Sequence, residues 1–312
     1  MILLWGALHD SPLAEVLQEL DLRDTPYLLI NQANILESKI ELDTDCRIKG
    51  KINYLSKEYD SGMFKSAYIR TYDFTEEDGF NITDRNDPLF MNAIRFEQDM
   101  GIMLDNHPGR IVNRLSNCFS NSSKPFQMDV IKAHGFDVPE TIITSSPQYA
   151  KDLLSKHNKI IYKSISSYRS IVSCITAKEV ARLDDICWCP TQFQQYISGN
   201  DYRVHVLHDK IFTTKIISSE SDYRYAKDTQ LTDFKLPAAI EEKCFCLTQS
   251  LGLHFSGIDL RNNGNDQWYC FEVNPSPGYT YFSNATGQKI TSELVDYLLN
   301  APALAQPIPY FN

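Results

Sequence analysis

Two apolar runs close to the carboxyl end, joined by a polar segment, constrain the fold of this chain most. Residues 255–260 have the sequence Phe-Ser-Gly-Ile-Asp-Leu, and residues 271–274 have the sequence Phe-Glu-Val-Asn. Between them, Asn-Asn-Gly-Asn at 262–265 is typical of a β-hairpin turn. Pro275 and Pro277 follow the second run, and proline cannot extend a central ladder of hydrogen bonds. The pattern therefore predicts an antiparallel hairpin whose second strand ends near residue 274.

Three oxygen-bearing side chains on this hairpin form the first candidate site. Glu272 and Asn274 lie two positions apart on one strand and so share a face, and Asp259 lies on the other strand. A two-residue turn at Asn263 and Gly264 would leave Asp259 about 13 Å from Glu272. A longer loop, centred between positions 265 and 266, would place the two carboxylates opposite each other. Such oxygen atoms are ligands of Mg²⁺, which usually carries phosphates in proteins, so a metal site requires the longer loop.

The composition and charge of the chain limit the classes of protein it can belong to. Its 312 residues are enough for one large domain or two to three small ones, and 43% apolar and 12% aromatic residues can form a substantial core. A disordered chain is excluded, because the charged fraction of 22% is moderate. The net charge of −10 argues against nonspecific binding of nucleic acid, although a local basic patch is compatible with it.

The amino terminus and the cysteines indicate where such a protein works. The first residues, Met-Ile-Leu-Leu-Trp-Gly-Ala-Leu, lack a basic segment and are too short an apolar run for a signal peptide, and no stretch reaches the ~18–20 apolar residues of a membrane helix. Eight cysteines fit reduced thiols, so we expect a cytoplasmic protein. Two C-x-C pairs, at 187–189 and 244–246, fit either buried thiols or a zinc site, although structural zinc sites usually have C-x₂₋₄-C spacing.

Hydrophobic periodicity and turn residues predict a mixed α/β chain in two parts. A strand at 2–4, a helix opened by Ser11 as its cap and Pro12, and a strand at 27–30 form a βαβ-like start without the glycine-rich turn of a dinucleotide site. Asn-His-Pro-Gly at 106–109 ends a helix and marks the boundary between the parts. Beyond it, helices and strands alternate up to a final amphipathic helix at 288–299.

Two lysines are candidates for binding phosphate. Lys163 lies within the apolar strand 160–165, where an unpaired ammonium group is costly to bury. It is either an edge-strand lysine that extends to water or a ligand of a nucleotide phosphate. Lys124 precedes a helix start, where anions bind readily, but it could equally be an ordinary surface charge. The hydroxyl-rich loop 164–171 fits a phosphate flap or a plain solvated loop.

A strand at 191–197 that stops at an Ile-Ser-Gly turn is a more specific signal. Backbone groups at Gln195, Tyr196 and Ile197 could bind an adenine edge, and Asp201 could reach a ribose. Arg203 begins the next strand, and its guanidinium suits phosphate or carboxylate. Arg224, in Asp-Tyr-Arg at 222–224, is another such cation, although single loop arginines are usually solvated.

Taken in order, these segments resemble the ATP-grasp superfamily over roughly residues 111–300. The likeness is to the branch with ribosomal-protein glutamate ligases and, more closely, to peptide-modifying ligases of the microviridin (graspetide) type. It is carried by Gln-Phe-Gln-Gln-Tyr-Ile-Ser-Gly-Asn-Asp-Tyr-Arg-Val at 192–204, by 222–224 and by Glu-Val-Asn-Pro-Ser at 272–276. The resemblance implies a small N-terminal α/β (pre-ATP-grasp) domain at 1–110 and an ATP-grasp domain at 111–312, with a first lobe at 111–190 and a C-terminal lobe at 191–312 that holds the Mg–ATP site.

The resemblance also implies a role for each candidate residue. The lysines would bind ATP phosphates, residues 195–197 would form the adenine hinge, and the two arginines would face the reacting phosphate, carboxylate or acceptor. The implied nucleotide ligands are Lys124, Lys163, Gln195, Tyr196, Ile197, Asp201 and Arg203. The implied catalytic residues are Arg203 and Arg224. The implied ligands of two Mg²⁺ ions, with Mn²⁺ as a substitute, are Asp259, Glu272 and Asn274.

The function that follows from the resemblance is an ATP-dependent ligase. A substrate carboxylate would be activated as an acyl phosphate and joined to an amine or hydroxyl, on a peptide or protein substrate as in the maturation of ribosomally made peptides. The alternatives are an amino-acid ligase for a small molecule or protein tail, and a nucleotide-binding module without turnover, because the loop after Lys163 lacks the superfamily's glycines. A homodimer is possible, neither nucleic acid nor membrane is expected as a partner, and Arg70 is either structural or a ligand of a substrate carboxylate.

Overall fold

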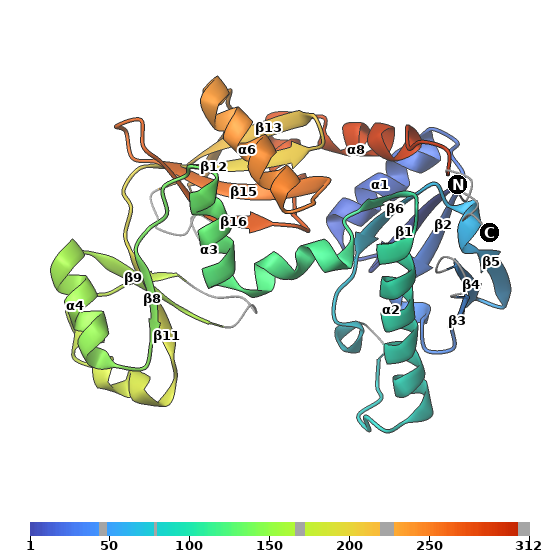
Figure 1. The fold of residues 1–312 in the computed structure, drawn as a ribbon, viewed down its shortest axis with the longest axis horizontal. Coiled ribbons are helices and arrows are strands. Elements are labelled where there is room, and N and C mark those ends of the chain that lie inside the picture. Colours follow the sequence, from blue (N-terminus) through green and yellow to red (C-terminus); the bar gives the residue numbers. More distant parts are fainter. Residues whose placement is uncertain (44–48, 78–79, 166–171, 219–227, 305–312) are drawn as a thin grey trace, which may run out of the picture. The chain divides into compact units, whose positions relative to one another are not determined.

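The computed structural model describes residues 1–43, 49–77, 80–165, 172–218 and 228–304 (Figure 1). The chain forms two compact units, and neither is continuous in sequence. Unit 1 comprises Met1–Phe119, Gln249–Ser256 and Pro275–Asn312, and unit 2 comprises Ser120–Thr248 and Gly257–Asn274. The predicted domain boundary between residues 110 and 111 stays a prediction, since the compact units group the chain by contact and not by sequence order.

A parallel sheet forms the centre of unit 1, with strand order β2-β1-β6-β7. Its strands are β1 (Ile2–Gly6), β2 (Tyr27–Asn31), β6 (Ser66–Arg70) and β7 (Arg110–Val112). The helices of this unit are α1 (Ser11–Leu22), α2 (Pro88–Asn106), α7 (Thr280–Thr286) and α8 (Ile290–Leu299). Strands β1 and β6 are buried along their whole length, as parallel strands covered on both faces are.

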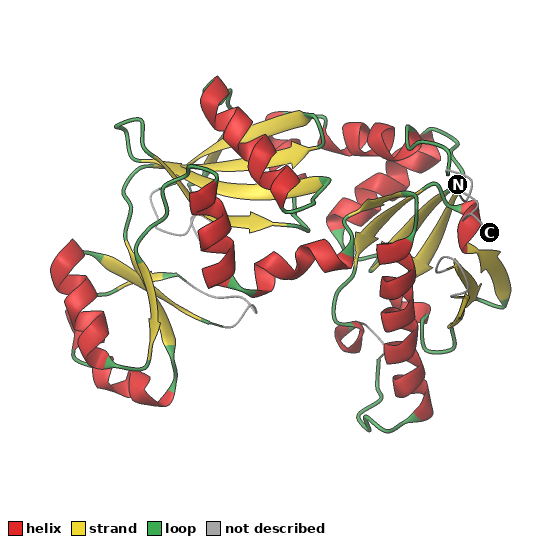
Figure 2. Ribbon diagram, in the orientation of Figure 1, coloured by secondary structure: helices red, strands yellow, loops and turns green. Residues whose placement is uncertain are grey.

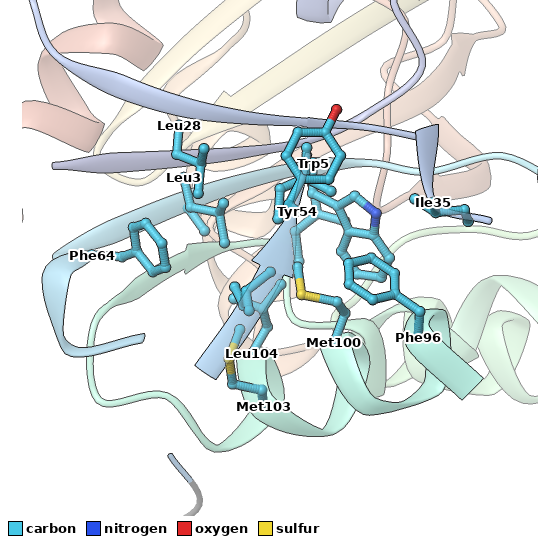
Figure 3. Packing of buried hydrophobic residues seen from close by; sticks show 14 of the residues in the cluster. Leu3, Trp5, Leu28, Ile35, Tyr54, Phe64, Phe96, Met100, Met103 and Leu104 are labelled. Atoms are coloured by element: carbon cyan, nitrogen blue, oxygen red, sulfur yellow. The ribbon is translucent and has the colours of Figure 1, made fainter. Parts of the chain in front are cut away.

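The hydrophobic core of unit 1 lies between this sheet and α2. Figure 3 shows Leu3 and Trp5 of β1 packed toward Phe96, Met100 and Leu104 of α2. A small antiparallel sheet adds to the same core and consists of β3 (Lys39–Asp43), β4 (Lys49–Tyr54) and β5 (Lys57–Asp60). Along β4, buried and exposed residues alternate, so that one face of the small sheet contributes apolar side chains and the other meets water.

The cap of α1 differs from the sequence prediction. The helix begins at Ser11, but the cap is Asp10, whose carboxylate accepts a hydrogen bond from the backbone N–H of Leu13 at 3.0 Å. The prediction of Ser11 as the cap was therefore wrong by one residue. Pro12 lies within the first turn as predicted, because that position needs no backbone donor.

Unit 2 contains two sheets, whose strands are yellow in Figure 2. The four-stranded sheet has the order β10-β9-β11-β8 and consists of β8 (Thr141–Thr144), β9 (Ile160–Ser164), β10 (Ser173–Cys174) and β11 (Thr191–Gln195). Helices α4 (Pro147–His157) and α5 (Ala177–Val180) belong to this lobe. Its core joins Ala150 and Leu153 of α4 to Phe193 of β11.

The five-stranded sheet of unit 2 carries most of the candidate site residues. Its order is β14-β13-β12-β15-β16. The strands are β12 (Asn200–Leu207), β13 (Lys210–Ile217), β14 (Gln230–Asp233), β15 (Phe255–Asn262) and β16 (Trp268–Asn274). Helix α3 (Lys124–Ala133) packs on β16, and α6 (Ala238–Ser250) precedes β15. Strands β12 and β13 pair as an antiparallel hairpin.

None of the helices in the described parts of the chain is both long and apolar enough to cross a membrane.

Candidate functional site

The β15–β16 hairpin brings the two candidate carboxylates together. Asp259 is directly opposite Glu272, and Gly257 is opposite Asn274. The loop runs from Asn263 to Gln267 and is closed by a 3.2 Å hydrogen bond from the N–H of Asn263 to the carbonyl of Gln267. The longer loop required by a metal site is therefore confirmed. A register shift between Asp259 and Leu260 adds one residue to β16, as in a β-bulge, and thereby aligns the two carboxylates.

Lys124 lies beside Glu272. It is the first residue of α3, and its Nζ forms an ion pair with Oε1 of Glu272 and donates a 2.9 Å hydrogen bond to Oδ1 of Asn121. The predicted phosphate-binding lysine and the predicted metal-binding glutamate thus share one location in unit 2, although they are far apart in the sequence. Both side chains are only partly buried, so a ligand can reach them.

Gln127 fixes α3 to the edge of β16. Its side-chain amide donates a 2.8 Å hydrogen bond to the carbonyl of Val273 and accepts one of 3.1 Å from the N–H of the same residue. This pair of bonds replaces a ladder partner on the outer edge of β16, next to Glu272. The sequence analysis missed Gln127; the signal was a carboxamide at a position of the helix that faces the sheet.

Arg203 forms an ion pair with Asp259. Its Nη1 lies 2.7 Å from Oδ1 of the carboxylate, and its side chain is 8% exposed, against 37% for Asp259. Burial raises the pKa of Asp259, the nearby carboxylate of Glu272 raises it further, and Arg203 lowers it. Two facing carboxylates therefore stand between two cations, Lys124 on one side and Arg203 on the other. The two carboxylates offer a hard divalent cation the oxygen ligands that it prefers.

The predicted hinge begins at the last residue of β11. The strand ends at Gln195 and not at residue 197, because its pairing with β9 ends at Ile160. The N–H of Gln195 donates to the carbonyl of Glu140 at 2.8 Å, and the N–H of Tyr196 donates to the carbonyl of Lys159 at 3.2 Å. Tyr196 and Ile197 therefore leave the sheet and turn toward β12.

Asp201, at the start of β12, has a partner that the sequence did not indicate. Both of its oxygens accept hydrogen bonds from Arg261 of β15, at 2.6 and 2.7 Å. Arg261 also donates to the carbonyl of Ile197 at 2.7 Å. The available signal was an arginine two positions after Asp259 in an otherwise apolar strand.

The remaining predicted ligands are placed less completely. Lys163 lies on β9, opposite Gln192 of β11, in the four-stranded sheet and not on the carboxylate hairpin. Asn274 is the last residue of β16 and is partly buried. Arg224 and most of the predicted flap, residues 166–171, lie outside the described residues.

Arg70 has a structural environment in unit 1. Its guanidinium forms a buried ion pair with Asp10, with Nη2 at 2.7 Å from Oδ1 and Nε at 2.9 Å from Oδ2. Its Nη1 donates to Oγ of Ser276 at 2.8 Å and to the carbonyl of Pro277 at 3.1 Å. Burial alone would raise the pKa of Asp10, but Arg70 lowers it below its usual value. These contacts favour the structural interpretation of Arg70 over a substrate-binding one.

The C-x-C pairs give no support to a zinc site. Cys187 and Cys189 are exposed, and Cys244 is buried while Cys246 is exposed. The interpretation as buried thiols is therefore wrong for three of these four residues. Within the described ranges, no three His, Cys, Asp or Glu side chains are arranged to hold a metal ion. The hairpin site differs in that its third ligand would be the amide of Asn274.

Solved structures share the fold over almost the whole chain. The macrocyclase MdnC from Microcystis aeruginosa MRC, bound to its precursor peptide MdnA, superposes with a TM-score of 0.81 at 17% identity and covers 96% of this chain and 99% of that one. The ATP-grasp ligase PsnB, complexed with a phosphomimetic precursor variant, Mg and ADP, gives 0.77 at 19% identity, covering 96% and 97%. An ATP-grasp ligase from Chryseobacterium gregarium, complexed with ADP and leader and core peptides, gives 0.78 at 19%, covering 96% of each chain. The predicted ATP-grasp fold is confirmed.

Curated relatives match a smaller part of the chain. Human N-acetylaspartylglutamate synthase A is 24% identical over 207 residues, which are 61% of this chain and 52% of that protein. A protein of Chromohalobacter salexigens named "Probable alpha-L-glutamate ligase" is 24% identical over 198 residues, 58% of this chain and 65% of its own. The chain thus spans about half to two thirds of the length of these relatives. The model of the RimK-like ATP-grasp domain matches residues 121–298, more than half of the sequence, and the chain therefore belongs to that family.

Proposed function

We propose that the protein is an ATP-dependent ligase that activates a carboxylate as an acyl phosphate and joins it to an amine or a hydroxyl. The observation that carries this proposal is the pairing of Asp259 with Glu272, flanked by Arg203 and Lys124. The members of this group come from one helix and three strands of unit 2, and the two carboxylates lie between the two cations. Such an arrangement suits a reaction in which two anionic groups must approach each other.

The residues of the hairpin fit Mg²⁺ as the metal. Two carboxylates and one carboxamide are hard oxygen donors, which Mg²⁺ prefers. Mg²⁺ held there by Asp259, Glu272 and Asn274 would supply charge neutralisation for the phosphates of ATP. The presence of Mg and ADP in the PsnB complex supports the same pair of ligands here.

The candidate site residues would each have a part in this reaction. The hinge after β11 would hold the adenine, and Lys124 would release Glu272 and bind a phosphate oxygen. Arg203, held by Asp259, would orient the terminal phosphate toward the substrate carboxylate. The carboxylate oxygen attacks the γ-phosphorus as the bond to ADP breaks, and the acceptor then attacks the acyl carbon and expels phosphate. Without the cations, Coulomb repulsion between carboxylate and phosphate would oppose the first step.

We infer a peptide or protein as the substrate. The structures of MdnC and PsnB with precursor peptides support this choice, since the fold is shared over 96% of the chain. Addition of an amino acid such as glutamate is the second candidate, supported by the names of the curated relatives. The predicted cytoplasmic location and homodimer stay predictions.

Formation of ADP tests the proposal. The wild-type protein is incubated with Mg–ATP and either peptides rich in Glu, Lys, Ser and Thr or L-glutamate alone, and release of ADP and phosphate is measured. Glu272→Ala is expected to lower the rate by at least about 100-fold while the fold is retained, because one ligand of the metal is lost. Glu242→Ala, on the exposed side of α6, is the control. Near-normal turnover of Glu272→Ala would disprove the metal assignment, and binding of ADP without turnover of any substrate would favour a non-catalytic module.

A further inference from the structure

Arg261 connects the predicted hinge to the strand that carries Asp259. It lies two positions beyond Asp259 on β15. Its Nε and Nη2 bind both oxygens of Asp201, and its Nη1 binds the carbonyl of Ile197 at 2.7 Å. One side chain thereby connects β15 both to the segment that follows β11 and to the start of β12. Arginine suits this task because its donors form a rigid planar fork.

The ion pair between Arg261 and Asp201 is sheltered from water. The side chains are 14% and 24% exposed, respectively. Burial alone would lower the pKa of Arg261, but the hydrogen bonds and the charge of Asp201 raise it, so the guanidinium stays charged. The Cζ atom of Arg261 lies 5.3 Å from the ring centre of Phe271, so that the guanidinium also makes a cation–π contact. Charge-assisted bidentate bonds in such surroundings are stronger than those of a solvated pair.

The backbone supports the same connection at Gly199. This residue has a φ of +138°, a backbone angle that residues with a side chain rarely adopt. A Cβ at this position would also collide with the carbonyl oxygen of Asn262. The turn after the hinge therefore lies directly against the residue that follows Arg261. Side-chain and backbone contacts both fix the hinge to β15.

We propose that Arg261 is a positioning residue of the nucleotide site, which sets the hinge and Asp201 at a fixed distance from the ligands on the β15–β16 hairpin. This inference rests on the proposed function, because it assumes that a nucleotide spans the hinge and the carboxylates. A nucleotide binds well only if its base and its phosphates meet their partners at the same time. Arg261 would thus hold the partners of the base and of the phosphates in place before the nucleotide binds, without being one of those partners itself.

Titration of the nucleotide-free protein with Mg–ADP tests this role, because calorimetry reports the dissociation constant and the fraction of binding-competent protein separately. Arg261→Met keeps the apolar stem and removes all donors. We expect its dissociation constant to rise about 10-fold or more, with a stoichiometry close to that of the wild type. Arg261→Lys retains the charge and one donor group without the planar fork, and should show a smaller rise. The control is Arg182→Met, which removes another Arg–Asp pair of unit 2 whose side chains are exposed.

The outcomes separate positioning from a merely structural role. If Arg261 only stabilises the fold, Arg261→Met lowers the stoichiometry and leaves the dissociation constant unchanged, which would overturn the proposal. If Arg261→Met does not fold, Arg261→Lys decides, and a wild-type dissociation constant in that variant would overturn it equally. If the wild-type protein binds no Mg–ADP, the proposed function itself has failed, and this result cannot be confused with the others.

Discussion

Asp201 is the residue whose role the structure makes most specific. The resemblance places it near the ribose, and in the structure both of its oxygens bind Arg261. A carboxylate oxygen has two lone-pair sites, so one oxygen can accept from Arg261 and from a ribose hydroxyl at once. Its bond to Arg261 would then orient it for the sugar.

Removal of the ribose hydroxyl tests this role. We expect the wild-type protein to bind Mg–2′-deoxy-ADP about 5–20-fold more weakly than Mg–ADP, because a hydrogen bond to a charged group is lost. In Asp201→Asn the difference between the two nucleotides should shrink to about 2-fold or less. Equal affinity of the wild type for both nucleotides would argue that Asp201 serves Arg261 and does not contact the 2′ hydroxyl.

Glu97 on α2 makes the stability of unit 1 depend on pH. Its pKa is raised to about 7, mainly by burial and also by the charge of Asp73, while a 2.6 Å hydrogen bond from Nε2 of Gln32 acts in the opposite direction. The folded protein therefore holds a proton that the unfolded chain releases near its ordinary value of 4.5. Stability from this group is complete below about pH 4.5 and is lost as the pH rises through about 7.

Glu97→Gln should remove this dependence, since it keeps the shape and stays neutral. At pH 8 we expect the variant to be more stable than the wild type by about 1–3 kcal/mol, and near pH 4.5 the difference should vanish. Urea unfolding between pH 4.5 and pH 8 measures the difference, and the exposed Glu58→Gln serves as the control. A difference that does not grow with pH would show that Glu97 titrates normally.

Among single residues, the charged ones could be predicted from the sequence, but the residues that hold them in place could not. Three of them, Asp259, Glu272 and Arg203, stand out because charges in apolar strands are costly without partners. Lys124 stands out because it precedes a helix start, where anions bind. Gln127 and Arg261 do not, because their function depends on which segments lie next to them in space. Asn113 is similar: its amide binds the carbonyls of Phe255 and Pro275, which only the folded chain brings together.

Among the elements, the β15–β16 hairpin was predictable in register but not in detail. A metal site requires Asp259 to lie opposite Glu272, and this requirement predicted a loop centred between positions 265 and 266. The structure does pair Asp259 with Glu272. The loop is centred half a residue earlier, at Asn265, and the extra residue at Phe271 compensates. Alternation alone did not indicate the bulge. Without it, a loop centred at Asn265 would place Asp259 opposite Phe271 and turn Glu272 to the other face of the hairpin. The end of β11 at Gln195 was also missed, since it depends on the length of the partner strand.

The turn between β11 and β12 depends on a glycine. Gly199→Ala is expected to destabilise the protein more than an alanine at a positive φ normally does, because the new Cβ would also displace Asn262 of β15. We expect a lower melting temperature and at least about 5-fold weaker binding of Mg–ADP, since the hinge moves with the turn. Gly264→Ala is the control, because Gly264 has a φ of +90° and open space around it. Equal effects of the two substitutions on binding would contradict a role for the contact with Asn262.

The two compact units show what sequence order conceals at the scale of the whole molecule. Unit 1 includes residues 249–256 and 275–312, although most of unit 2 precedes these residues in the sequence. Strand β15 therefore begins in one unit and continues in the other. A reading along the chain assigns everything after residue 110 to one domain, because helices and strands alternate there without a break. Which segments return to the first unit depends on contacts such as those of α8 with α1.

The location of the candidate site within one unit gives a prediction for the whole molecule. Apart from Arg224, which is not described, every predicted nucleotide and metal ligand lies in the described parts of Ser120–Thr248 and Gly257–Asn274. Saturating Mg–ADP, at about 100 times its dissociation constant, should stabilise the protein by about 2.7 kcal/mol. Hydrogen exchange should slow mainly in residues 191–207 and 257–274, and much less in residues 1–43, because the ligand binds only groups of unit 2. EDTA should abolish the effect, since the phosphates would lose the cation that joins them to Asp259 and Glu272. Equal protection in both units, or protection that persists without Mg²⁺, would show that the nucleotide binds elsewhere.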